Sequence, residues 1–415
     1  MFDRAVLSKK GTVPLVVALA VDMIGSGLFM PVSLLYFTAV SRIPLTSVGL
    51  LMSAATIATL PVPVLIGYLA DRWNPRDLVL VAQVLQAAGF AAYRWADGPV
   101  PILVVVVVVA VGQRVFWSSF FTLVAGLAPP GEERRLNDQR FALVGTVQAA
   151  ATGLGALVGG LVLVDASVSA YRLVASANAV SFAVSAVLLT LVPRGAGQQP
   201  EAARAAATGS YRVLLRDRPY LLLIVANTVF ALCSVMVGIA VPVSIVEGAP
   251  SLKWLIGPLL AVNALLLATG QGFVVRWARP LSRVRAMAVA GGLWVLWSVA
   301  FAAALRVPPV VLLPYLLISM LFYAGADLLH APISNALAAA AAPEHVRGRY
   351  LAVFQYCFTI ANIAAPTFFT ALYARGAALP WIVLGILTAA ATAAMYLLEK
   401  RLPAEEEEPV KAMSV

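Results

Sequence analysis

The stretch GYLADRWNPRD, residues 67–77, places a cluster of charges between two long apolar runs. Gly67 permits close helix packing, because it has no side chain that keeps a neighbouring helix away. Asp71 can cap a helix end or pair with a cation, and Arg72 and Arg76 make the loop basic. Taken alone, this pattern indicates a charged turn between two membrane-spanning helices.

The composition is that of a membrane protein with many spans. Of the 415 residues, 61% are hydrophobic and 12% are charged, and the mean hydropathy is +0.91. Soluble domains are usually about 45–50% apolar and about 25% charged. A soluble core of this size cannot hide so much apolar surface behind so few charges. We therefore expect a multi-pass protein of the cell membrane, in contact with the lipid bilayer.

Twelve apolar segments are long enough to span a membrane. A helix needs about 20 apolar residues to cross about 30 Å of hydrocarbon. The segments are residues 13–38, 46–70, 78–96, 100–128, 140–164, 170–193, 219–246, 254–275, 285–305, 308–338, 350–374 and 379–398. The predicted fold class is an all-α membrane protein of twelve transmembrane helices.

One long connection divides these segments into two sets of six. Residues 194–218 are polar and basic, and they follow six spans and precede six more. We predict an N-terminal half over 1–193, a cytoplasmic linker over 194–218 and a C-terminal half over 219–399. The acidic tail, residues 400–415, is predicted to be disordered.

The distribution of lysine and arginine predicts the orientation. Most of the 29 lysines and arginines fall at the two termini, in the linker and in loops on the same side of the predicted bundle. Those on the other side are Arg42, Arg94, Arg172, Lys253, Arg306 and Arg375. Cytoplasmic loops carry the excess of positive charge, so we expect both termini in the cytoplasm. The net charge of +10 is then a consequence of topology, and we expect no nucleic-acid partner.

The sequence offers no set of metal ligands. Its two cysteines, Cys233 and Cys357, lie inside apolar segments, and its two histidines are His330 and His345. We therefore expect no metal site and no cofactor.

The charged turn resembles the signature loop of the major facilitator superfamily. The matching residues are Gly67, Leu69, Ala70, Asp71, Arg72 and Arg76. The departures are Asn74, where the family usually has a second glycine, and Pro75, where it has a basic residue. The resemblance implies two six-helix halves that alternate in access, with this loop as a conformational switch.

Internal similarity agrees with that resemblance. GFVVRWARP, residues 272–280, follows the eighth span as GYLADRWNP follows the second, with Arg276 in place of Asp71. Residues 347–366 likewise repeat the pattern of 137–156. Parallel repeats of this kind imply a substrate site between the halves near the bilayer midplane.

Two further features resemble drug–proton antiporters of the superfamily. Asp22 is followed nine residues later by Pro31, and Gly155, Gly159 and Gly160 resemble a glycine-rich motif of the fifth span. That motif usually has a proline after its first glycine, where this chain has Ala156. The alternative is that the glycines only allow close helix packing.

Asp22 and Arg114 are charges inside predicted spans. Asp22 lies about 13 Å from the cytoplasmic end of the first span, and Arg114 lies about 21 Å from the outer end of the fourth. In a slab of about 30 Å the two depths nearly coincide. Because the family places helices 1 and 4 side by side, we expect an ion pair, or an Asp22 whose proton Arg114 controls. The alternative is a purely structural clasp between the helices.

Polar and aromatic stripes predict one central cavity. Asp22 shares a helix face with Ser26, Phe29, Ser33 and Tyr36. The other predicted lining residues are Trp117, Phe121, Asn227, Phe230, Tyr323, Gln355 and Asn362. Asp327 is a second candidate for proton coupling, or it lies in a wet vestibule, and we expect His330 at the membrane interface.

These features predict a transporter without enzymatic activity. We expect proton-coupled export of a small amphipathic or hydrophobic compound by alternating access, in a bacterial membrane and by a monomer. The alternative is proton-coupled uptake of a small metabolite. The partners are then a small-molecule substrate and protons. No phosphate-binding GxxxxGK[ST] loop occurs in the sequence, which argues against an ATP-driven pump.

Overall fold

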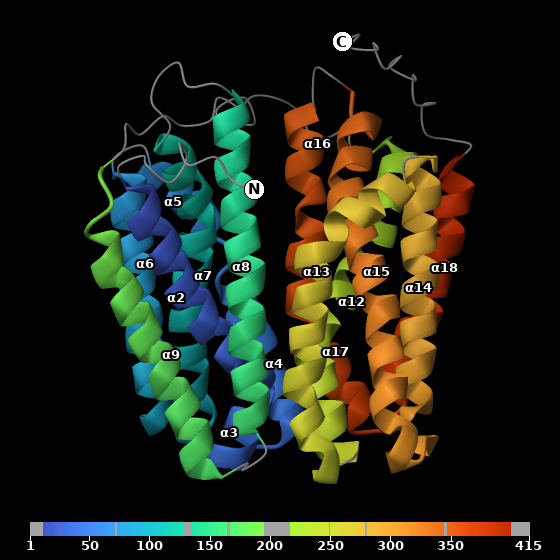
Figure 1. Ribbon diagram of the computed structural model, residues 1–415, viewed down its shortest axis with the longest axis horizontal. Coiled ribbons are helices and arrows are strands. Elements are labelled where there is room, and N and C mark those ends of the chain that lie inside the picture. Colours follow the sequence, from blue (N-terminus) through green and yellow to red (C-terminus); the bar gives the residue numbers. More distant parts are fainter. Residues whose placement is uncertain are drawn as a thin grey trace.

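The computed structural model is a bundle of long helices arranged in two groups (Figure 1). It describes residues 11–70, 73–127, 134–163, 167–194, 216–248, 250–278, 280–343 and 347–399. Most of the predicted linker, the predicted tail, Asp71 and Arg72 lie outside the described residues. The described secondary structure is entirely helical, which suits a protein in lipid, because a helix satisfies its own backbone hydrogen bonds.

The first group contains the helices of predicted spans 1 to 6. They are α2 (Thr12–Phe29), η1 (Met30–Val32), α3 (Ser33–Val40), α4 (Leu45–Ala58), α5 (Val62–Ala70), α6 (Pro75–Ala92), η2 (Tyr93–Trp95), α7 (Pro99–Gly126), α8 (Arg134–Val162) and α9 (Val168–Leu189).

The second group contains the helices of predicted spans 7 to 12. They are α12 (Arg218–Gly248), η3 (Pro250–Leu255), α13 (Ile256–Ala278), α14 (Arg283–Ala303), η4 (Ala304–Arg306), α15 (Pro309–Ala341), α16 (Arg347–Phe354), α17 (Tyr356–Tyr373) and α18 (Leu379–Glu399).

Helical structure covers the twelve predicted spans. Ten of the described helical segments are long and apolar enough to cross a membrane. The other two predicted spans are interrupted: residues 59–61 separate α4 from α5, and Gln355 separates α16 from α17. Pro61 and Pro63 explain the first interruption, because a proline lacks the amide hydrogen that an internal helix position donates.

Side-chain caps fix the starts of three helices at the positions where the sequence turns polar. Asn74 accepts a hydrogen bond from the backbone nitrogen of Arg76 at 3.1 Å, at the start of α6. Ser167 caps α9 and Ser282 caps α14 in the same way. Such caps satisfy amides that have no partner within the helix.

The two groups pack against each other through α8 with α13 and through α4 with α17. We call the end of the bundle where α2 begins the terminal end, and the end that carries α3, at the bottom of Figure 1, the distal end. Near the distal end, Thr367 on α17 donates a hydrogen bond of 2.7 Å to Ser53 on α4. A Cβ atom on Gly160 of α8 would lie 2.0 Å from the backbone nitrogen of Gly257. The two groups therefore meet closely at the distal end.

The glycines of α8 act in helix packing. A Cβ atom on Gly155 would lie 2.0 Å from the carbonyl oxygen of Ile24, and one on Gly159 would lie 2.2 Å from that of Leu28. Gly155 and Gly159 hold α8 against α2, while Gly160 allows contact with the other group. This is the packing alternative of the sequence analysis, and small residues commonly serve it in membranes.

The outer surface of the bundle is apolar. Large side chains such as Phe273, Leu173 and Val310 are 75%, 66% and 91% exposed. Soluble monomers rarely expose apolar side chains so widely. This surface suits lipid contact, so the chain is a multi-pass membrane protein.

Candidate functional site

Asp22 is a buried carboxylate held by two neutral donors. It lies on α2 with 1% of its surface exposed. Gln83 of α6 donates from Nε2 to Oδ2 at 2.6 Å, and Ser26 donates from Oγ to Oδ1 at 3.2 Å. A carboxylate bound by donors without charge is solvated by dipoles, not neutralised by a cation.

The predicted Asp22–Arg114 ion pair is wrong for this conformation. The ion pairs between described residues join Arg194 to Asp77 and Arg285 to Glu399. Arg114 is partly exposed and forms none. Residues of α2 and α7 line the same cavity, but the depth of a residue along its helix does not determine the direction in which its side chain points. Gln113, the neighbour of Arg114 in sequence, is among the α7 residues that line a cavity with Asp22, and Arg114 is not.

Asp22 lines a cavity of about 400 Å³ inside the first group of helices, which we call the N-half cavity. Of the predicted lining residues, Ser26, Phe29 and Trp117 do line it. Its other walls include residues that the sequence analysis missed: Met23, Gln86, Phe90, Gln113, Thr152, Asn178 and Phe182. The cavity is therefore mostly apolar and aromatic, with one carboxylate and several amides.

Two predicted lining residues do not reach the N-half cavity. Tyr36 is fully buried in an aromatic cluster, with its ring centroid 5.2 Å from that of Phe37 and 5.5 Å from that of Tyr93. Phe121 is 46% exposed and packs beside Trp117. Both lie on helices that contribute to the cavity, but their side chains turn away from it.

A second cavity, of about 440 Å³, lies between the two groups of helices, and we call it the central cavity. Asp327 and Tyr323 of α15 line it together with Ser234 of α12. Ser234 donates a hydrogen bond to Asp327, and the Tyr323 hydroxyl donates to the Ser234 carbonyl oxygen at 2.7 Å. Met30 and Thr152 line both cavities, so the central cavity and the N-half cavity adjoin.

The expectation for His330 is wrong, because its side chain is 1% exposed inside the second group of helices. Its Nε2 lies 2.9 Å from Oδ1 of Asn227, and its ring packs against Trp294 at 5.1 Å between centroids. Asn227 and Phe230 are fully buried with it and line neither cavity. His330 and Asn227 therefore form a polar contact within the helix core, and Phe230 packs beside it.

The predicted lining residues of the eleventh span are exposed and line neither cavity. Gln355 donates from Nε2 to Oδ1 of Asn335 at 3.1 Å, which ties the junction of α16 and α17 to α15. Asn362 donates to the carbonyl oxygen of Phe358 on its own helix at 2.8 Å.

Arg76, from the predicted switch loop, caps another helix. Its guanidinium donates to the carbonyl oxygens of Leu189 at 2.9 Å and Thr190 at 2.7 Å, at the end of α9. A cation suits this position, since the last carbonyls of a helix carry partial negative charge. Gly67 lies in α5. In the second group, Arg285 similarly ties the start of α14 to Glu399 at the end of α18.

Gln83 is the main residue that the sequence analysis missed. Its signal was an amide side chain inside an apolar span, repeated three residues later by Gln86 on the same helix face. An amide in lipid is costly unless it finds a partner or a cavity, as both of these do.

Two bundles of membrane-spanning helices with a cavity at their interface are the arrangement found in many secondary transporters. The chain belongs to the Major Facilitator Superfamily, whose family model matches residues 15–366. It has the fold of that family, twelve helices in two halves, as predicted. Members of the family carry small-molecule substrates across the membrane, and the family is not a class of enzymes.

Relatives by sequence are named as multidrug resistance proteins. The chain is 26% identical over 352 residues to multidrug resistance protein MdtH of Sodalis glossinidius (strain morsitans), covering 82% of this chain and 81% of the relative. It is 28% identical to MdtH of Proteus mirabilis (strain HI4320), covering 69% of this chain and 67% of the relative.

Solved structures share the fold. The nucleoside transporter NupG, in a mutant form, superposes with a TM-score of 0.75 at 12% identity, covering 94% of this chain and 99% of that one. The xylose transporter XylE from E. coli, in an inward open conformation, gives a TM-score of 0.67 at 17% identity, with 92% and 95% covered.

Proposed function

We propose that this protein exports a small amphipathic or hydrophobic compound in exchange for protons. The observation that carries the proposal is Asp22, a carboxylate 1% exposed in the wall of a mostly apolar cavity, with Gln83 and Ser26 as its partners. Ionisable groups inside transmembrane segments are costly, and they commonly mark ion or proton pathways.

The walls of the N-half cavity suggest the substrate class. Phe29, Trp117 and Phe182 offer apolar ring surface, while Gln86 and Gln113 offer hydrogen bonds. Sites of this kind favour compounds with a large apolar part and one or two polar groups. The name of the MdtH relatives agrees with such a substrate.

Asp22 is placed to exchange a proton when its surroundings change. Burial penalises the ionised carboxylate, and the donors from Gln83 and Ser26 offset that penalty. Relative motion of α2 and α6 that lengthens the Gln83 bond would favour the protonated form. Coupling follows if that motion accompanies the change of access. Asp327, held by Ser234 in the adjoining cavity, is the second carboxylate on the path.

The proposed orientation assigns a state to this conformation. With both termini in the cytoplasm, as the lysine and arginine distribution favours, the distal end faces outward. The contacts between Thr367 and Ser53 and between Gly160 and Gly257 then close the outer side. In this proposal each monomer works alone, and its two halves, residues 1–193 and 219–399, rock about the central cavity.

A transport assay tests the proposal. Small amphipathic compounds are screened for thermal stabilisation of the purified protein, and those that stabilise it are then assayed in proteoliposomes with a pH gradient. We expect substrate to move against the direction of proton flow. Movement of substrate with the protons would support uptake of a metabolite, and transport independent of the gradient would refute proton coupling.

A further inference from the structure

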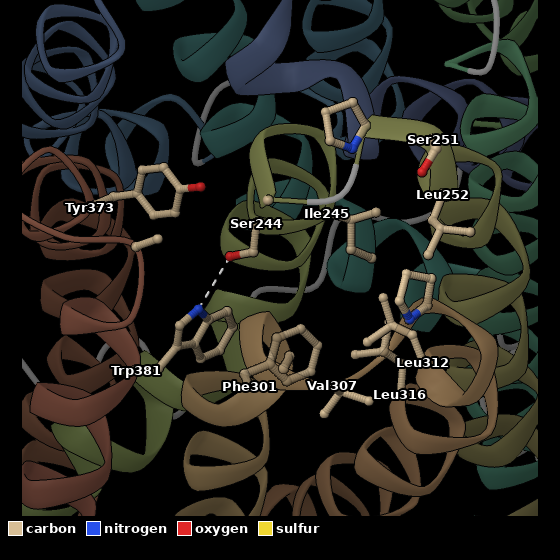
Figure 2. Close-up of a pocket in the computed structure, with 15 residues that line it drawn as sticks. Ser244, Ile245, Ser251, Leu252, Phe301, Val307, Leu312, Leu316, Tyr373 and Trp381 are labelled. Carbon is tan, nitrogen blue, oxygen red and sulfur yellow. Dashed lines mark hydrogen bonds between the residues drawn. The ribbon is translucent and has the colours of Figure 1, made fainter.

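A third cavity lies inside the second group of helices at its distal end (Figure 2). We call it the C-half cavity; its volume is about 340 Å³. It lies among α12, η3, α14, η4, α15, α17 and α18, and it shares no lining residue with the N-half or central cavity. The transport cycle proposed above does not use it.

The internal repeat of the chain relates this cavity to the first group of helices. Gly27 and the sequence Pro31-Val32-Ser33 recur as Gly238 and Pro242-Val243-Ser244, an offset of 211 residues. The residue numbers of η2 (Tyr93–Trp95) and η4 (Ala304–Arg306) differ by the same 211 residues. The distal ends of the two groups are thus in register along two separate elements.

At that offset, two aromatic residues of the first group correspond to two small residues of the second. Phe37 corresponds to Gly248, and Tyr93 corresponds to Ala304. The rings of Phe37 and Tyr93 are 1% and 4% exposed and pack with centroids 5.0 Å apart. Gly248 and Ala304 both line the C-half cavity. The cavity therefore lies where the related half places two packed aromatic rings.

The remaining wall is suited to an aromatic ligand with one polar group. Trp381 and Phe301 stack with centroids 4.4 Å apart, which presents a flat apolar surface. Ser244 accepts a hydrogen bond of 3.2 Å from Trp381, and Figure 2 shows the Tyr373 hydroxyl on the same side of the cavity. None of the described lining residues is charged.

We propose that the C-half cavity binds one uncharged small molecule with two aromatic rings and a hydroxyl group. Its rings take the positions that Phe37 and Tyr93 hold in the first group, against Trp381 and Phe301. Its hydroxyl reaches Ser244 or Tyr373. Rings packed edge-on or offset in this way contribute more binding free energy than their buried area alone provides.

Binding of 4-benzylphenol, an uncharged molecule with two separate rings and one hydroxyl, to the purified protein in lipid nanodiscs tests this proposal, with protein-free nanodiscs as the blank. We expect one saturable equivalent per chain. Ala304→Tyr restores the ring of the first group and should weaken binding at least tenfold. Val310→Tyr is the matched control: it adds the same ring at the same end, on a side chain that is 91% exposed, and it should bind like the wild type.

A second measurement uses the wild-type protein, so that it does not depend on a variant folding. A photoreactive hydroxybenzophenone is crosslinked to the chain and the labelled peptides are mapped. Labelling within residues 244–252, 301–316 or 373–381, prevented by excess 4-benzylphenol, supports the proposal. Absence of saturable binding, equal binding by Ala304→Tyr and wild type, or labelling confined to the N-half or central cavity overturns it.

Discussion

Replacing Gln83 by leucine removes the shorter of the two hydrogen bonds on Asp22 and leaves the carboxylate in place. The lost bond joins Nε2 of Gln83 to Oδ2 of Asp22 at 2.6 Å inside the helix core. A hydrogen bond to a charged group contributes about 1.5–3 kcal/mol. The other polar atom of the Gln83 amide, Oε1, has no hydrogen-bond partner among the described residues, so the substitution removes no second hydrogen bond.

The sign of the effect follows from which form of Asp22 the bond stabilises. Gln83 donates, so it stabilises the ionised carboxylate, and its loss favours the protonated form. At 1.36 kcal/mol per pH unit, losing this hydrogen-bond free energy corresponds to a shift of about 1–2 pH units. We expect the pH profile of gradient-driven transport by Gln83→Leu to move to higher pH by that amount.

The assay is initial transport rate in proteoliposomes as a function of pH, at a constant pH difference across the membrane. Gln86→Leu is the matched control, because Gln86 lines the same cavity one turn along α6 but donates to the carbonyl oxygen of Ala82. Its profile should stay at the wild-type position. If Gln83→Leu keeps the wild-type profile, or if both variants shift equally, Asp22 does not titrate in the transport cycle.

Three other predictions concern the fold and its switching. Gly160→Leu places a side chain against the backbone of Gly257, where a Cβ atom would lie 2.0 Å from the nitrogen. It should separate α8 from α13 at the distal end, at a cost of about 1–3 kcal/mol. Spin-label distances between α8 and α13 that match the wild type would contradict this. Arg76→Ala removes two hydrogen bonds to the end of α9 and should lower the unfolding temperature. Arg194→Ala breaks an exposed ion pair with Asp77 and should change the unfolding temperature little. Equal effects of the two variants in thermal unfolding would disprove the capping role. Cysteine at position 204 should be protected from a membrane-impermeant reagent in intact cells and cysteine at position 253 should be labelled, and the reverse result would invert the orientation.

The fold was predictable because membrane helices are specified by length and hydropathy. Each of the twelve predicted spans corresponds to helical structure, and the broken second span has its cause in Pro61 and Pro63. The charged turn at 67–77 named the family correctly, and the family model covers most of the chain.

The candidate site was predictable only in part, because sequence gives the depth of a residue more reliably than its rotation about the helix. Asp22, Ser26 and Phe29 line the cavity as predicted, since they share one face of one helix. The partner of Asp22 depends on how α6 and α7 are rotated against α2. That rotation brings Gln83 to the carboxylate and places Gln113, not Arg114, at the cavity.

Polarity alone also does not separate a cavity wall from a helix contact. Asn227 and His330 have the character of lining residues, but Oδ1 of Asn227 and Nε2 of His330 lie 2.9 Å apart and pair within the core. A buried polar pair and a polar cavity wall leave the same pattern in a single helix. Only the packing of neighbouring helices distinguishes them.

The measurement that tests the central claim most directly is substrate accumulation by Asp22→Asn in proteoliposomes under an imposed pH gradient. Asparagine is close to the protonated carboxyl in shape and cannot release a proton. We expect that the variant still binds a stabilising compound in the thermal assay but no longer concentrates it, while Asp77→Asn, which changes a partly exposed carboxylate outside both cavities, transports like the wild type. If Asp22→Asn still concentrates the compound at the expense of the proton gradient, Asp22 is not the coupling carboxylate.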